Sequence, residues 1–310
     1  MKKYFVFLAL GIIILAAGCA NNTNTTTTTG KTFIGGTDAI KFDFLEGSPP
    51  AEVFDGGSYP FEVALNLENK GEFDVAKNDI EIRLLGFYAP DFNNPNITKN
   101  PDEDLDGAFI DSDGNKMPGT VTYVTFPGFN YIGNLTAGEN KFTVRADVCY
   151  KYGTKAQANL CVLEDLTELN EKVCKVNEKK TVESSSAPIK IENLDENVAG
   201  SEKITFSFEI VHRGTGAIST SGSKCNDNIG YENKVYVTVD SGLSGLTCSG
   251  FEGGTATTGY VTLYGGKRLI RCTQDTTGLT GDFEKKANIN LLYDYKEHKD
   301  IGILVKHTTQ

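Results

Sequence analysis

The cysteines are the residues whose spacing says most about the chemistry of this 310-residue chain. One of the seven stands alone near the N-terminus, and the other six lie beyond residue 148. In an exported chain, which the N-terminus indicates below, an even set favours disulfide bonds. A metal site is disfavoured, because no two of them form a Cys-x-x-Cys pair and no histidine lies at ligand spacing from a pair. The disulfide candidates are Cys149, Cys161, Cys174, Cys225, Cys248 and Cys272.

The spacing of the cysteines favours one set of pairings. Cys149 and Cys161 flank the segment GTKAQ (153–157) symmetrically, and a hairpin turning there would place them opposite each other. Cys248 and Cys272 lie on or beside neighbouring predicted strands, so we expect them to pair as well. The third pair would tie the connector between two domains to the second domain. The two cysteines left for it are Cys174 and Cys225.

The acidic segment PDEDLDGAFIDSDG has residues that could bind a cation. Asp102, Asp104 and Asp106 alternate before a glycine, and Asp111 and Asp113 follow before another. This is similar to the front of a calcium loop, where oxygens at alternate positions converge and glycine permits the sharp turn. The last position of such a loop holds Asp113 here, not the usual bidentate glutamate. A structural calcium ion is therefore the only cofactor to consider, and a solvated acidic loop is the alternative.

Other catalytic signals are missing from the sequence. The three histidines are set in no motif with Ser, Asp or Glu, and no GxSxG, HExxH or Gly-rich phosphate loop occurs. The formal net charge is −11 and no block of basic residues occurs, which disfavours nucleic acid as a partner. The sequence therefore predicts a protein that is not an enzyme. A hydrolase with a carboxylate pair distant in sequence is the remaining catalytic alternative.

Two stretches of the chain look like copies of one strand. Phe61–Gly71 (FEVALNLENKG) and Ile204–Gly214 (ITFSFEIVHRG) alternate apolar and polar residues, as strands with one buried face do. Each ends in a glycine, which would suit a turn with positive φ. The same offset of 143 relates Tyr150-Lys151-Tyr152 to Tyr293-Asp294-Tyr295. We interpret this as a tandem repeat; the alternative is two unrelated β-domains with common strand patterns.

The pattern of elements predicts an all-β fold, with two tandem Ig-like β-sandwich domains and a short helical connector. The domains would span 37–163 and 187–310, and the connector 164–186 would carry a helix with Leu166, Leu169, Val173 and Val176 on one face. Each domain would end in a hairpin, with loops at 153–157 and 296–300. The strands are expected near 40–45, 61–68, 79–86, 120–127, 141–151 and 158–163, then near 188–192, 203–211, 234–240, 259–264, 268–273, 287–295 and 301–306.

The N-terminus indicates where the chain is located. Two lysines precede an apolar run of signal-peptide length that ends in LAAGC, and this ending resembles the lipobox of prokaryotic lipoproteins. The resemblance implies that residues 1–18 are a signal peptide, that Cys19 is lipidated, and that 19–36, rich in Asn and Thr, is a tether. The body would then lie at the cell surface, on the extracellular face of the cytoplasmic membrane. The alternatives are ordinary cleavage near the same point or an uncleaved short anchor.

Four Asn-x-Thr tripeptides are candidate acceptors for N-linked glycans. They begin at Asn21, Asn24, Asn96 and Asn134.

Two further stretches resemble known surface proteins. LNLENKGEFDV (65–75) resembles Ig-like surface modules of the CARDB type, an adhesion-related family of secreted prokaryotic proteins. CYKYGTKAQANLC (149–161) is similar to a segment of uncharacterised archaeal cell-surface proteins. Neither resemblance implies a catalytic role.

We expect a membrane-anchored extracellular protein that acts by binding, by adhesion or in envelope assembly. Its partners would be the membrane, through the N-terminal lipid, and another surface protein or a glycan. The loops 87–119 and 212–233 are the expected binding loops. The first alternative is a subunit that self-associates into a surface layer or filament. The second is a solute-binding lipoprotein or an enzyme accessory protein.

Overall fold

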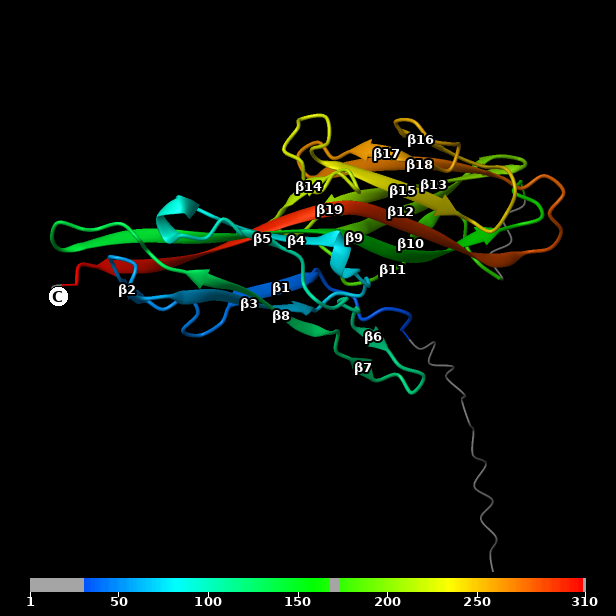
Figure 1. Ribbon diagram of the computed structural model, residues 1–310. Coiled ribbons are helices and arrows are strands. Elements are labelled where there is room, and N and C mark those ends of the chain that lie inside the picture. The colour runs from blue at the N-terminus through cyan, green and yellow to red at the C-terminus, as the bar shows by residue number, and fades with distance from the viewer. Residues whose placement is uncertain (1–30, 168–172, 309–310) are drawn as a thin grey trace, which may run out of the picture. The chain divides into compact units, whose positions relative to one another are not determined.

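The first half of the described chain consists of strands joined by turns and two short 3-10 helices (Figure 1). The computed structural model describes residues 31–167 and 173–308. The elements of this half are β1 (Ile40–Phe44), β2 (Glu52–Phe54), β3 (Phe61–Asn69), η1 (Lys77–Asp79), β4 (Ile80–Leu85), η2 (Ala89–Phe92), β5 (Thr98–Lys99), β6 (Phe109–Ile110), β7 (Lys116–Met117), β8 (Val121–Phe129) and β9 (Glu139–Val162).

The second half is built in the same way, and the predicted all-β sandwich is confirmed. Its elements are β10 (Glu178–Lys180), β11 (Val182–Ser184), β12 (Ile189–Gly200), β13 (Lys203–His212), β14 (Ala217–Ser219), β15 (Lys234–Asp240), β16 (Leu246–Ser249), β17 (Thr258–Thr262), β18 (Lys267–Asp275) and β19 (Phe283–Lys306).

The strands form three main sheets and one small hairpin. The three-stranded sheet has the order β1-β3-β8, and the five-stranded sheet has the order β10-β12-β13-β18-β16. A nine-stranded sheet carries the path β17-β15-β19-β9-β4-β5, with β2 and β14 beside β19 and β11 beside β9. β6 and β7 pair only with each other. β19 and β9 lie at the centre of this path, with two shorter strands on each side of them.

The two hairpins predicted at the domain ends are wrong. β9 and β19 are each continuous, and they pair antiparallel with each other along their whole length, from Phe283–Val162 to Lys306–Glu139. Gly153, the first residue of the first predicted loop, has no positive φ. It is small because a Cβ there would lie within 3.0 Å of the ring of Phe73, which packs over this part of the strand. Close packing, not chain reversal, explains this glycine.

The polar run 296–300 was wrongly predicted to be a loop for a different reason. It lies on an exposed stretch of β19, where charged side chains find partners across the strands. Asp300 accepts hydrogen bonds from Arg145 on β9 at 2.8 and 3.0 Å, and Lys299 forms an ion pair with Asp43 on β1. A polar run between apolar strands is therefore the solvent face of one long strand here.

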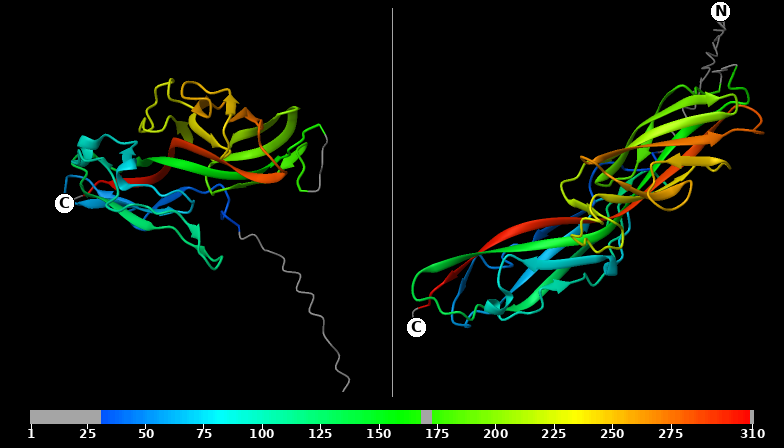
Figure 2. Two further views of the ribbon diagram at one scale, coloured as in Figure 1. Left: turned by 90° about the vertical axis from the view of Figure 1, so that its right-hand side faces the viewer. Right: turned by 90° about the horizontal axis from the view of Figure 1, so that it is seen from above.

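Each lobe of the body contains half of both long strands (Figure 2). We call the first lobe 31–138 with 139–150 of β9 and 295–306 of β19, where β4 and β2 pair with them. The second lobe is 173–282 with the remaining halves, where β11 and β15 pair with them. The three-stranded sheet lies along the first lobe and the five-stranded sheet along the second (Figures 1 and 2). One hydrophobic cluster contains core residues of both lobes.

The connector carries strands where a helix was expected. Its described part, 164–167 and 173–186, holds β10 and β11 and no helix. Leu166 and Val176 are buried in a small separate core, whereas Val173 is exposed, so they do not form one helical face. Leu169 lies outside the described residues. Among the described residues, no helix has the length and apolar character needed to cross a membrane.

Candidate functional site

Four buried tyrosines occupy the centre of the long strand pair. Tyr150 pairs with Tyr295 and Tyr152 pairs with Tyr293 in the β9–β19 register, and all four side chains are buried. Neighbouring ring centroids are 5.7 to 6.4 Å apart, a range in which aromatic side chains attract each other. Burial raises the pKa of all four hydroxyls above its usual value, so they stay neutral. A two-fold axis through the Lys151–Asp294 pair would exchange Tyr150 with Tyr293 and Tyr152 with Tyr295. The two residues of each exchanged pair are 143 positions apart in the sequence.

The hydrogen bonds of Tyr152 and Tyr295 follow the same offset of 143 positions. The Tyr152 hydroxyl donates to Asn69 Oδ1 at 3.2 Å. The Tyr295 hydroxyl lies 3.1 Å from His212 Nε2, and Asn69 and His212 are also 143 positions apart. Burial lowers the pKa of His212, which keeps the ring neutral beside this hydroxyl. The last residue of β3 in the first lobe and the last residue of β13 in the second lobe therefore each contact a tyrosine from the other lobe's half of a long strand.

The other two tyrosines, Tyr150 and Tyr293, each bond to the opposite long strand. The Tyr150 hydroxyl donates to Glu297 Oε2 at 2.9 Å, and the Tyr293 hydroxyl lies 3.3 Å from Thr154 Oγ1. Thr154 and Glu297 are again 143 positions apart. Because every hydroxyl has a partner, the polar groups of the cluster are satisfied within the core.

Gly71 and Gly214, the two glycines of the sequence repeat, leave space for the hydroxyls of Tyr152 and Tyr295. Neither Gly71 nor Gly214 has positive φ, so the predicted turn reason is wrong. A Cβ on Gly71 would lie within 3.0 Å of Tyr152 Oη, and one on Gly214 would lie within 3.0 Å of Tyr295 Oη. A side chain at either glycine would displace the tyrosine beside it.

A loop of the second lobe is bound across the seam between the lobes. Asp294 is buried and accepts hydrogen bonds from the backbone of Gly222 at 2.9 Å and Lys224 at 2.7 Å. Next to them, Cys225 forms a disulfide with Cys149 on β9. A polar hollow of about 130 Å³ lies here, lined among others by Asp79, Lys151 and Asp294. The predicted binding loop 212–233 is thus held at both the disulfide and the carboxylate.

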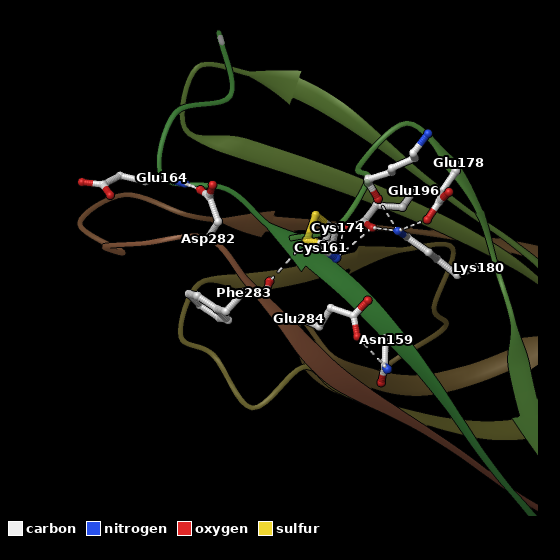
Figure 3. The surroundings of a disulfide bond; sticks show 11 residues. Asn159, Cys161, Glu164, Cys174, Glu178, Lys180, Glu196, Asp282, Phe283 and Glu284 are labelled. Carbon is white, nitrogen blue, oxygen red and sulfur yellow. Dashed lines mark hydrogen bonds and ion pairs between the residues drawn. A yellow bond between two sulfur atoms is a disulfide. The ribbon is translucent and has the colours of Figure 1, made fainter. Parts of the chain in front are cut away.

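A second disulfide closes the far end of the second lobe (Figure 3). Cys161 at the end of β9 bonds to Cys174, and the backbone N–H of Cys161 donates to both oxygens of Glu196 at 2.9 and 3.0 Å. Glu196 is buried, and burial raises its pKa to about 7 despite that hydrogen bond and the nearby charge of Lys180. Lys180 Nζ lies 3.2 Å from Glu196 and 2.8 Å from Glu178. This buried ion pair holds β10 beside β12.

One of the three predicted cysteine pairings is confirmed and two are wrong. Cys248 and Cys272 are cross-strand partners on β16 and β18 and form a disulfide. Cys149 and Cys161 lie on one continuous strand, which separates them by about 40 Å at the usual rise per residue, far beyond disulfide reach. Each bonds to one of the cysteines that had been left to pair together. The observed bonds are Cys149–Cys225 and Cys161–Cys174.

The structure does not bring the five aspartates of the calcium candidate together. Asp104 accepts from the backbone of Lys77, and Asp111 closes the β6–β7 turn by accepting from Asp113 and Asn115. The backbone of Asp102 accepts from Lys77, and that of Asp106 accepts from Thr120. Among the described residues, no group of three or more His, Cys, Asp or Glu side chains is arranged to hold a metal ion.

Two of the four glycan acceptors lie in the described chain, and both are exposed. Asn96 precedes β5, and its N–H donates to Asn94 Oδ1. Asn134 lies in the loop between β8 and β9. Cys19, Asn21 and Asn24 lie outside the described residues, as do the signal peptide and most of the tether.

Sequence reasoning missed three buried carboxylates that organise loops. Besides Glu196 and Asp294, Asp55 is buried and accepts from the backbone of Leu135 and Thr308 and from His307 Nδ1 at 2.8 Å. The bond from His307 and the two backbone bonds lower the pKa of Asp55 to about 2. Asp294 had a signal, because it stands between two tyrosines of the repeat; the other two had none.

No protein-family model matches this sequence, and no curated protein matches it either.

Proposed function

We propose that this protein is a lipid-anchored, non-catalytic protein of the extracellular face, which acts by binding through Ig-like modules. The observation that carries the proposal is that all six cysteines of the described chain are used in disulfides. Disulfides persist in oxidising compartments outside the cytoplasm. The lipobox-like LAAGC ending at Cys19 supports the same location.

The proposed binding region is the loop 87–119 of the first lobe. Its side chains Tyr88, Phe109 and Met117 are exposed, and the last two face each other across the β6–β7 hairpin. Exposed apolar side chains that gather on one element mark interaction sites. The loop 212–233 also exposes Ile229 and Tyr231, but the disulfide and Asp294 restrict its freedom to adapt.

Lipid labelling on intact cells tests the location. Cells making the full chain are fed a clickable fatty acid, and half are treated with protease before lysis. We expect label on the wild type, none on Cys19→Ala, and digestion of the body by external protease. A wild-type chain that takes no label and survives the protease would overturn the proposal. Cys248→Ser serves as a control, because it removes a disulfide-bonded cysteine that the lipidation signal does not involve.

A second candidate, self-assembly into a layer or filament, is favoured by the edge strand β8. The strand VTYVTFPGF ends the three-stranded sheet, carries no charge and exposes Val121 and Tyr123. Uncharged edges of this kind pair with other chains. Its far end is covered, because Lys99 Nζ donates to the Thr125 carbonyl at 2.6 Å and Asn94 donates to the Pro127 carbonyl at 2.9 Å.

Cross-linking on intact cells separates the two candidates. Links between copies that disappear in Tyr123→Lys, but persist in Tyr264→Lys on the second lobe, would establish self-assembly through β8. Links to a different surface protein that are lost in Phe109→Ser would establish recognition by the 87–119 loop. If neither variant changes the links, both assignments of surface fail.

A further inference from the structure

One end of the first lobe exposes an apolar patch. Phe54, Tyr59 and Ile132 leave 39%, 40% and 51% of their surface exposed. The rings of Phe54 and Tyr59 pack edge to face, with centroids 5.5 Å apart. Rings fixed in this way offer a rigid apolar surface that costs little entropy to cover.

The patch lies where two loops run side by side. The backbone N–H of Gly56 donates to the Gly133 carbonyl at 3.0 Å, and that of Gly57 donates to the Tyr131 carbonyl at 2.8 Å. A Cβ on Gly57 would lie 3.6 Å from Ile132, which places this side chain over the 54–59 loop. The loop that holds the two aromatic rings is therefore bonded to the loop that holds Ile132.

Asn134 stands at the border of the patch. A Cβ on Gly56 would lie 3.4 Å from Asn134 Oδ1, so the amide is beside the loop between Phe54 and Tyr59. The next residue, Leu135, is held because its N–H donates to Asp55 Oδ2 at 2.8 Å. Asn134 itself is exposed, as is Thr136, which completes the Asn-x-Thr tripeptide. The backbone around the acceptor is thus fixed while its side chain faces solvent.

We propose that Asn134 carries an N-linked oligosaccharide whose first sugars pack on Phe54, Tyr59 and Ile132. The inference rests on the extracellular location proposed above, because the transfer occurs outside the cytoplasm. In the transfer, Asn134 Nδ2 forms a bond to C1 of the sugar and loses a proton. The bond from C1 to the phosphate of a lipid-linked oligosaccharide donor breaks, and the lipid phosphate leaves. Sugar rings carry apolar C–H faces, which suit exposed aromatic rings.

The position of Asn134 makes it a better acceptor than Asn96. The tripeptide at Asn96 runs into β5, where Thr98 pairs with Arg83 of β4. The tripeptide at Asn134 lies in a loop without strand pairing and has the exposed patch beside it. The second half of the chain has no Asn-x-Ser or Asn-x-Thr tripeptide. A glycan at Asn134 would therefore mark the first lobe alone.

Mass spectrometry of the native chain tests the modification directly. Trypsin releases each candidate in its own peptide, Asn134 in 117–141 and Asn96 in 84–99. We expect the 117–141 peptide to carry a glycan mass that is lost in Thr136→Ala, where the acceptor asparagine remains. A chain that is labelled by lipid and cut by external protease, but whose 117–141 peptide is unmodified, would overturn this inference and leave the proposed location intact.

Hydroxyl-radical footprinting tests the packing of the sugar. Labelling of Tyr59 is compared between the native protein and Thr136→Ala, with the exposed Tyr88 as internal reference. We expect protection of Tyr59 in the native protein, loss of that protection in the variant, and equal labelling of Tyr88 in both. Equal labelling of Tyr59 on a modified chain would show that the sugar does not cover the patch.

Discussion

Replacing Gly214 by alanine tests whether the buried tyrosines explain the repeated glycines. The added Cβ would lie 2.7 Å from Pro188 Cβ, 3.1 Å from Tyr295 Cζ and nearer still to Tyr295 Oη. Overpacking of this kind costs about 1–3 kcal/mol. For a body of this size we expect the melting temperature to fall by roughly 2–10 °C. Thermal unfolding followed by circular dichroism, with the disulfides intact, measures it.

A double-mutant cycle identifies the cause of that loss. Tyr295→Phe removes the hydroxyl that accepts from Gly216 N at 2.7 Å, and an unsatisfied buried donor costs about 1–3 kcal/mol. In Gly214→Ala/Tyr295→Phe, the methyl group takes the space that the hydroxyl has left. The double variant should therefore lose less stability than the two single variants together, by about 0.5–3 kcal/mol.

Two comparisons sharpen the result. Gly302→Ala, on an exposed stretch of β19 where the nearest atom is the flexible Lys141 Cε at 3.4 Å, should melt with the wild type. At Gly71, a Cβ would also lie 2.8 Å from the Ser186 carbonyl and nearer still to the Asp38 carbonyl, two backbone groups that Tyr152→Phe leaves in place, whereas the close atom that stays at Gly214 belongs to the Pro188 side chain. Rescue should therefore be weaker there. A Gly214→Ala protein that melts with the wild type, or a strictly additive cycle, would refute the argument.

Three further outcomes follow from the disulfides, Glu196 and the acidic segment. Replacing Cys149 and Cys225 by serine should lower the free energy of unfolding by about 4–5 kcal/mol, and replacing Cys161 and Cys174 by about 3 kcal/mol, because the two disulfides close loops of 76 and 13 residues. Urea unfolding measures both losses, and equal losses would contradict the prediction. The pKa of Glu196 in the folded protein is raised to about 7. Glu196 therefore contributes its full stabilisation of the fold below its unfolded pKa, and this contribution is lost as the pH rises through 7. The melting temperature of the wild type should thus fall relative to Glu196→Gln between pH 5 and pH 8, and that of Glu178→Gln, which keeps Glu196, should also fall relative to Glu196→Gln. Saturating calcium and a chelator should give the same melting temperature, since the five aspartates are not brought together; a rise with calcium would show a site that the fold does not reveal.

Local patterns in the sequence were sufficient for most strands and for one disulfide. In Phe61–Asn69 and Lys203–His212 the predicted apolar face is buried at every second residue, because a strand with one face on the core reads with period two. The other face is partly covered as well, since Ala64, Thr205 and Val211 are buried. Cys248 and Cys272 pair because each lies on such a strand and the strands are neighbours.

The turns were harder to predict, because glycine and polar runs have more than one cause. Gly153 and the run 296–300 read as hairpin loops, yet one accommodates the Phe73 ring and the other is the solvent face of β19. With both loops misread, the Cys149–Cys161 pairing followed as an error. The helix predicted in the connector failed in the described residues, because Leu166 and Val176 are buried beside a disulfide and not along one face.

The strand content, the offset of 143 and the even set of cysteines can be read from the amino-acid sequence, because they depend on residue type and on spacing along the chain. Which strands are neighbours is known only from the fold. β9 and β19 pair over their full length although residues 163–282 separate them in the sequence. That pairing determines the tyrosine centre, the reason for Gly71 and Gly214, and the two disulfides that spacing mispredicted. Contacts between residues so distant in sequence leave no local pattern, so the fold alone reveals them.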